Sequence, residues 1–237
     1  MIRHHFELRE TITTILADEQ YHIDAAVGGI FRARQAVERC IAGDSFFGAT
    51  FEPYDPGSDE PIVLRMVSAA KKAGVGPMAA VAGAIAWGGI EAMQEAGARY
   101  GVIDNGGDIA LFSDHELLIG VHAGSSPVSD RLAFVVPPTS EIIGICTSSA
   151  TVGPSISFGT ADAVTVFSHD VALADAWATA VCNEIRPDDT SVLLRIDPEE
   201  VSGVFSVIGE WTNSYGLLPP IVRANVRKDL ITAGRKL

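Results

Sequence analysis

The stretch GVIDNGGDIALF, residues 101–112, places five polar or glycine residues between two short apolar runs. An Asn-Gly pair between alternating apolar segments is the strongest short-range indication of a β-hairpin. A tight turn needs only two such residues, however, and successive glycine amides can also point into one concavity and bind an anion. The stretch therefore predicts either a plain hairpin turn or a ligand-binding bend, and it leaves both open.

Strands are predicted on both sides of this bend. Apolar residues recur with period two in short runs bounded by turn residues, at 100–103, 108–112, 116–122, 131–136, 141–147 and 161–168. Residues 5–18, rich in Thr and Ile, predict a strand pair or one long strand, and residues 45–54 predict another strand. Residues 191–196 and 203–209 are expected to add edge strands. Runs of this kind indicate an antiparallel sheet.

Four helices are predicted from apolar spacing of three and four residues, at 21–43, 60–74, 76–97 and 170–185. The third is apolar on nearly all sides, which is typical of a helix buried on both faces. Because strands occur in runs and do not alternate strictly with helices, the order favours an α+β fold with antiparallel sheets packed against helices. Without a composition break, residues 1–237 are expected to form a single domain, with internal duplication into two halves left open.

Composition excludes several classes of function. The chain has 237 residues, 47% of them hydrophobic, and a formal net charge of −13, which repels nucleic acid. The longest apolar run, 75–90, is short and glycine-rich, so no membrane span is expected. Scattered Cys40, Cys146 and Cys182, with no C-x-x-C pair and no recognisable signal peptide, favour a reducing compartment, the cytoplasm. The basic residues of 223–237 are expected to form a solvated C-terminal segment.

A second candidate for chemistry is the hydroxyl-rich stretch 144–162, which includes Thr147, Ser148 and Ser149. Small donors of this kind suit phosphate or ribose recognition, but Ser and Thr hydroxyls equally often satisfy their own backbone. Both interpretations stay open. The stretch has no G-K-[ST] ending, and no G-x-G-x-x-G fingerprint occurs between a strand and a helix.

A third candidate is the pair Asp175 and Thr179, four residues apart on a predicted helix and therefore on one face. A carboxylate beside a hydroxyl offers two hard oxygen ligands for Mg²⁺ or Ca²⁺. The plainer alternative is that the two side chains bond each other or water, although a carboxylate on so apolar a face requires a partner. The histidines form no H-E-x-x-H and there is no G-x-S-x-G elbow, so a histidine-based triad is not supported.

Three stretches, taken in order, resemble the ApbE-like superfamily, whose best-known members transfer FMN from FAD onto a protein threonine with Mg²⁺. These are MAAVAGAIA (78–86), VIDNGGDIAL (102–111), and the region 147–180 that contains TSSATVGPSISFGTADAVTVF and ALADAWATA. The resemblance covers roughly residues 76–185, and its wording is closest to an uncharacterised branch. It implies an α+β fold related to the tunnelling fold, and an FAD or FMN ligand.

The resemblance also implies roles for individual residues. Asp175 and Thr179 match the metal ligands of a D-x-x-A-T segment. A backbone carbonyl within 79–83, here assigned to Ala80, would complete the Mg²⁺ site. Further matching positions are expected to bind the flavin nucleotide: Asn105, Gly106, Gly107, Asp108, Thr147, Ser148 and Ser149. Asp108 is the expected catalytic base.

The chain also departs from the transferases. The Lys of their A-I-A-K-G is Ala82, a nearby Asp corresponds to Trp87, and no His follows the hydroxyl stretch. The leading hypothesis is therefore an ApbE-like protein that binds a flavin or other nucleotide with Mg²⁺, and transfer of FMN from FAD to a protein acceptor is left open. One alternative is a binding or assembly protein, for instance a homo-oligomer, that has lost the chemistry. Another is an enzyme of sulfur-containing small metabolites that uses Cys146.

Overall fold

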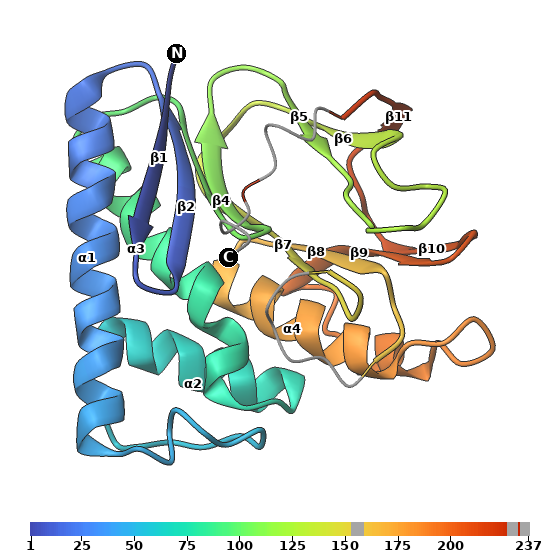
Figure 1. The fold of residues 1–237 in the computed structure, drawn as a ribbon, viewed down its shortest axis with the longest axis horizontal. Coiled ribbons are helices and arrows are strands. Elements are labelled where there is room, and N and C mark those ends of the chain that lie inside the picture. Colours follow the sequence, from blue (N-terminus) through green and yellow to red (C-terminus); the bar gives the residue numbers. More distant parts are fainter. Residues whose placement is uncertain (153–158, 227–231, 233–237) are drawn as a thin grey trace.

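The computed structural model describes residues 1–152, 159–226 and 232 (Figure 1). Its largest element is an eight-stranded sheet in which every neighbouring pair is antiparallel. In spatial order its strands are β1 (Ile2–Leu8), β2 (Thr11–Ala17), β3 (Gly101–Asn105), β4 (Asp108–Ser113), β7 (Thr139–Ser148), β8 (Ala163–Ser168), β9 (Val201–Ile208) and β10 (Trp211–Gly216).

A second, three-stranded antiparallel sheet branches from the first. Its spatial order is β11 (Ile221–Arg223), β6 (Leu132–Val136) and β5 (Leu117–Gly120). In the sequence, β5 and β6 come between β4 and β7, but they belong to the second sheet. In the large sheet β4 therefore pairs directly with β7. The predicted antiparallel α+β class is confirmed, whereas no duplication of halves is shown.

The helical elements are α1 (Gln20–Gly43), α2 (Pro61–Ala73), the 3₁₀ turn η1 (Pro77–Ala80), α3 (Val81–Glu95), α4 (Val171–Glu184) and the 3₁₀ turn η2 (Ser191–Arg195). In α1, buried Ile23, Ile30 and Val37 recur every seven residues and form a stripe that faces the core. In α2, Pro61 stands at the helix start and left-handed Gly74 ends it. At the start of α4, the Asp170 side chain accepts a hydrogen bond from Leu173 N at 2.8 Å.

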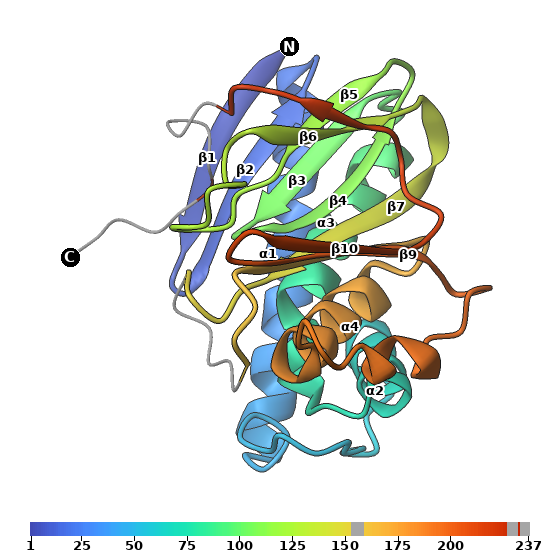
Figure 2. The same cartoon turned by 90° about the vertical axis from the view of Figure 1, so that its right-hand side faces the viewer.

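The four α-helices lie on one side of the eight-stranded sheet and the three-stranded sheet lies on the other (Figures 1 and 2). Each interface is a separate apolar cluster: Ile15, Ile103 and Val166 belong to the helical side, while Phe134 and Phe167 belong to the side of the small sheet. The large sheet therefore has two buried faces. A residue's place along a strand decides which layer it meets.

Glycines let α1 and α3 approach each other closely. A Cβ atom added to Gly29 would lie 2.3 Å from the backbone oxygen of Gly88, closer than atoms can pack. Side chains larger than hydrogen at this crossing would push α3 away from α1. The small-residue helix predicted from the sequence is thus used to bring α3 deep into the helical layer.

Three sequence predictions are wrong. Residues 45–54 form turns, with Phe47 N bonding Asp44 O and Thr50 N bonding Phe46 O, and no strand. Residues 191–196 form η2, because Ser191 N bonds the Asp189 side chain and starts a tight turn. The segment 223–237 is not simply solvated, since Thr232 is only 6% exposed. The edge strands β10 and β11 were not predicted.

In the described part of the chain, no single helix is long and apolar enough to cross a membrane; α2 taken together with η1 and α3 meets the length and composition requirement, but that pair is bent by 108°.

Candidate functional site

The bend between β3 and β4 is a two-residue hairpin turn. Asn105 pairs with Asp108 across it, and Gly106 and Gly107 both have positive φ, 70° and 110°. Such angles are those of the hairpin turns that favour glycine. The Asp104 side chain accepts a hydrogen bond from Gly107 N at 2.9 Å and fixes the turn. The hairpin interpretation of this stretch is therefore correct, and what decides its function is its surroundings.

The strand register sends the side chains around the bend to two different layers. Residues paired directly across antiparallel strands share one face of a sheet. Asn105, Asp108 and Cys146 are linked by such pairs and share the face of the helical layer. Asp104 pairs with Thr14 of β2 and lies on the opposite face, toward the small sheet. The bend thus presents acidic groups to both layers.

On the helical side, two residues from distant parts of the chain contact the start of α3. Asn105 Nδ2 donates to the Ala82 carbonyl oxygen at 2.9 Å, and Gly83 N donates to Asp175 Oδ2 at 2.8 Å. The Ala80 side chain gives α3 no cap of its own. Asp175, which is 7% exposed, therefore supplies from α4 a carboxylate that satisfies an amide at the N-terminus of α3.

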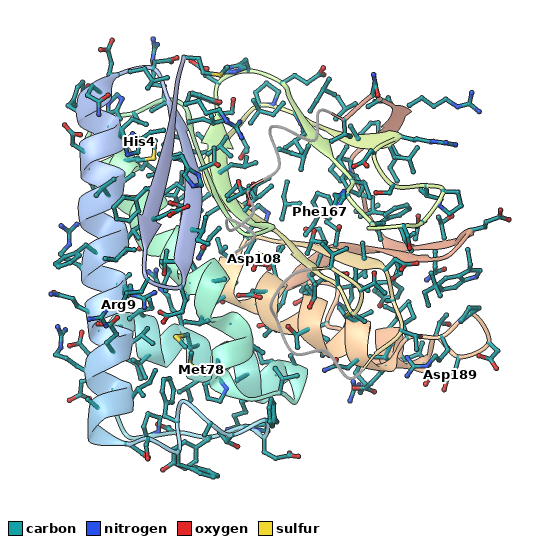
Figure 3. The ribbon with its side chains drawn as sticks, in the orientation of Figure 1. His4, Arg9, Met78, Asp108, Phe167 and Asp189 are labelled. Atoms are coloured by element: carbon teal, nitrogen blue, oxygen red, sulfur yellow. The ribbon has the colours of Figure 1, made fainter. Side chains whose placement is uncertain are left out.

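Burial and mutual repulsion keep these acids from ionising easily. Burial raises the pKa of Asp175 to about 7, against the opposing effect of the Gly83 and Ala82 amides. Burial, and then the charges of Asp175 and Asp104, raise the pKa of Asp108 well above its ordinary value. Figure 3 shows Asp108 where the central strands meet the helices. Three carboxyl groups thus share a region that either protons or a cation must neutralise.

The chemistry of this donor set fits Mg²⁺. Mg²⁺ prefers oxygen ligands and is commonly held by one or two carboxylates together with substrate phosphates. Within residues 1–152, 159–226 and 232, no group of three or more His, Cys, Asp or Glu side chains is arranged to hold a metal. A cation beside Asp175 would therefore need a hydroxyl, a carbonyl or a phosphate as further ligands. Thr179 is half-buried one helical turn after Asp175, and Ala80 is buried where η1 ends.

Several hydroxyl groups of the stretch 144–162 are engaged in hydrogen bonds within the protein. Thr147 Oγ1 lies 2.9 Å from Thr165 Oγ1, and Thr147 N donates to Gly107 O at 3.1 Å. Ser149 Oγ accepts from Thr151 N at 3.1 Å and from Val152 N at 2.9 Å, as in a serine turn. Ser148 ends β7 and is half-buried. Residues 153–158 of the stretch, with Gly153, Ser155 and Ser157, lie outside the described residues.

Cys146 is fully buried beside the bend, with Sγ 3.5 Å from the Val171 carbonyl oxygen. Burial, followed by the charges of Asp108 and Asp175, raises the pKa of its thiol well above the ordinary value. A thiol held in its neutral form is a poor nucleophile. These observations favour a core role for Cys146 over a catalytic one.

Two hollows of the described surface lie away from this cluster. A groove of about 310 Å³ runs between α1, α2 and α3, and a hollow of about 170 Å³ lies between Leu8 and α1. Neither is lined by the bend or by Asp175. A ligand of the acidic cluster would therefore lie over the bend and the start of α3, outside both hollows.

Sequence reasoning missed four participants. Gly83 was expected only as part of a carbonyl-donating stretch, but its amide is what contacts Asp175. Asp104 was noticed in the bend without a role. Thr14 and Thr232 were not singled out, yet their hydroxyl oxygens lie 2.8 Å apart beside Asp104. A threonine carries no periodic pattern that would have marked these positions.

Comparison with known proteins identifies the class. A family model described as "AbpE bacteria" matches residues 2–202. The chain is 60% identical over 238 residues to a UPF0280 protein of Methanoregula boonei, covering 100% of both, and 64% identical over 234 residues to one of Methanoculleus marisnigri, covering 99% and 96%. This chain belongs to the UPF0280 family, an ApbE-like family.

Solved structures show the same fold at low sequence identity. A point mutant of the Vibrio cholerae flavin transferase ApbE superposes with a TM-score of 0.60 and 11% identity, covering 90% of this chain and 96% of that one. The apo flavinyl transferase ApbE of Pseudomonas stutzeri gives a TM-score of 0.50 and 13% identity over 98% and 97%. The expected resemblance to the ApbE-like superfamily is thereby confirmed for the fold.

Proposed function

We propose that this chain binds FAD together with Mg²⁺ at the cluster formed by the glycine bend, the start of α3 and Asp175. The observation that carries the proposal is that Asp108 faces the helical layer, where α4 places Asp175, whose charge contributes to the raised pKa of Asp108. Asp175 also accepts a hydrogen bond from Gly83 N at 2.8 Å, so its carboxylate lies at the N-terminus of α3. Such a place suits a cation and a phosphate bound together.

In this proposal Asp175, Thr179 and the backbone carbonyl of Ala80 hold Mg²⁺. When bound, the ion would offset phosphate charge in a protein whose formal net charge is −13. The bond from Asn105 to the Ala82 carbonyl keeps the bend in place against α3. Gly106, which is exposed, and Gly107 let backbone approach the nucleotide, while residues 147–149 flank its organic part.

The chemistry that we propose is transfer of FMN from FAD to a hydroxyl of an acceptor protein, a class of reaction that the fold supports by likeness to flavin transferases. The acceptor oxygen would form a bond to the FMN phosphorus while the diphosphate bond breaks and AMP leaves. The acceptor's proton would go to Asp108. Since burial and Asp175 raise the pKa of Asp108, this base works only once its surroundings are neutralised.

A second candidate function is binding of the nucleotide without transfer. Two observations favour it. The position of the transferases' Lys is held by Ala82, whose carbonyl is already occupied by Asn105. Burial, and then the charges of Asp175 and Asp104, raise the pKa of Asp108, the acid that follows the bend, well above its ordinary value. Incubation with FAD, MgCl₂ and a candidate acceptor protein separates the two functions, because only transfer leaves flavin covalently attached to the acceptor after denaturation.

The binding proposal is tested by titrating FAD into the protein by calorimetry, with and without MgCl₂. We expect binding that depends on MgCl₂ and that weakens at least about tenfold in Asp175→Asn, a loss of about 1.4 kcal/mol. Asp188→Asn, which changes an exposed acid near the end of α4, is the matched control and should bind as the wild type does. Absence of FAD binding by the wild-type protein in MgCl₂ would overturn the proposal.

A further inference from the structure

The last residue that the structure describes, Thr232, is buried at the bend. Its side chain is 6% exposed, and its Oγ1 lies 2.8 Å from Thr14 Oγ1 of β2. Burial raises the pKa of Asp104, and the Thr232 hydroxyl beside its carboxyl opposes that effect. Thr14 and Asp104 are direct neighbours across β2 and β3. A residue from the C-terminal end therefore lies against two central strands, 218 positions away from Thr14.

The described chain that precedes Thr232 is bonded along the small sheet. β11 pairs with β6, and beyond it Ala224 N bonds Arg131 O at 2.9 Å and Val226 N bonds Asp130 O at 3.0 Å. Gly120 leaves room for Val226, since an added Cβ would lie 2.7 Å from a methyl of that valine. The described chain is thus bonded along the small sheet as far as Val226, six positions before Thr232.

Asp104 joins Thr232 to the bend. One Asp104 oxygen accepts the Gly107 amide at 2.9 Å, and Gly107 immediately precedes Asp108. A buried carboxylate is held in one orientation only when several donors fix it. The Gly107 amide is one such donor, and the Thr232 hydroxyl lies beside the carboxyl on the face of the sheet away from α4.

We propose that Thr232 is a positioning residue of the nucleotide site: its hydroxyl orients Asp104, and Asp104 in turn holds the Gly106–Gly107 turn that sets Asp108 beside Asp175. Thr232, which follows the three-stranded sheet in the sequence, is then a part of the site. Its role in ligand affinity rests on the proposed function, whereas its role in holding the turn does not.

The ligand-independent test is hydrogen exchange of the Gly107 amide, measured by NMR in the full-length protein. Thr232→Val removes the hydroxyl and keeps the shape, and we expect the Gly107 amide to exchange about fivefold faster, as the loss of one ordinary hydrogen bond implies. Thr232→Ser, which keeps the hydroxyl, should restore the wild-type rate. Thr212→Val makes the same change on the exposed edge strand β10 and should leave Gly107 unaffected.

Two results would overturn the proposal. One is an unchanged Gly107 exchange rate in Thr232→Val. The other is equal acceleration at Gly107 and at the Val166 amide in the centre of β8, which would indicate general loosening of the fold. FAD titration in MgCl₂ then adds the functional readout: affinity should fall several-fold in Thr232→Val and recover in Thr232→Ser. If the wild type fails to bind FAD, the proposed function fails while the Gly107 result still decides the role of Thr232.

Discussion

Oδ2 of Asp175 lies 2.8 Å from the backbone nitrogen of Gly83, although 92 positions separate the two residues. The contact joins the middle of α4 to the first turn of α3, which no side chain of its own caps. A carboxylate in this position satisfies an amide and the helix dipole at the same time. The same carboxylate lies on the side of the sheet that Asp108 faces, so its structural role and its proposed ligand-binding role meet at one side chain.

Gly83→Ala should disrupt this contact. A Cβ atom at position 83 would lie 2.8 Å from the Val171 carbonyl oxygen and 2.9 Å from Asp175 Cβ, so α3 and α4 would have to separate. We expect urea unfolding to show a loss of about 1–3 kcal/mol. Gly43→Ala, with nothing within 4 Å of the added atom, is the matched control and should be neutral or slightly stabilising. Equal stability of the two variants would contradict the packing.

The raised pKa of Asp175 predicts how stability depends on pH. A carboxyl with a pKa of about 7 in the folded protein and about 3.8 in the unfolded chain binds its proton more tightly when folded. Its contribution to stability is therefore fully present below pH 4 and is lost as the pH rises through 7. In EDTA, the free energy of unfolding of the wild type should fall between these pH values relative to that of Asp175→Asn. Parallel pH profiles for the two proteins would refute the assignment.

Asn105 should matter for stability through its amide group. Asn105→Ala leaves the Ala82 carbonyl without the donor that now lies 2.9 Å away in a buried setting. The expected loss is about 1–3 kcal/mol in the free energy of unfolding. Asn213→Ala on edge strand β10 makes the same truncation at a less buried place and should cost less than about 0.5 kcal/mol. A cost at Asn105 no greater than that at Asn213 would argue against the contact.

Cys146 should behave as a core residue. Iodoacetamide should modify half-buried Cys40 in the folded protein well before it reaches buried Cys146, as measured by mass spectrometry of digested peptides. Cys146→Ala should lower the free energy of unfolding by about 1 kcal/mol and leave FAD affinity unchanged. Rapid labelling of Cys146, or loss of ligand binding in Cys146→Ala, would contradict the core role and support an enzyme that uses the Cys146 thiol.

Regular repetition made most of the fold predictable. In α1, the buried residues Ile23, Ile30 and Val37 are seven positions apart. Side chains along the strands of the large sheet alternate between its two buried faces. The spacing of apolar residues was therefore enough to locate these helices and strands. Residues 45–54 misled the same reasoning because their aromatic residues pack individually. Phe47 is fully buried while Phe46 and Phe51 are exposed, and the backbone hydrogen bonds of the stretch are those of local turns.

The candidate site was predictable only where a motif marked it. The glycine bend and Asp175 carry recognisable patterns, and the structure brings Asp175 and Asp108 together. Thr179 stays a prediction as a metal ligand, since only its place one turn beyond Asp175 is shown. The role of Thr232 could not be predicted from the sequence. Its neighbours Thr14 and Asp104 belong to β2 and β3, and no motif around this threonine indicates a contact with those strands.

The most direct test of the account is the binding of Mn²⁺, a paramagnetic substitute for Mg²⁺, followed by loss of the free-ion electron paramagnetic resonance signal in the presence of FAD. We predict one Mn²⁺ per wild-type chain and at least about tenfold weaker binding in Asp175→Asn and Thr179→Val, with Asp188→Asn unchanged. Tight Mn²⁺ binding that survives Asp175→Asn would contradict the proposal that this carboxylate holds the cation.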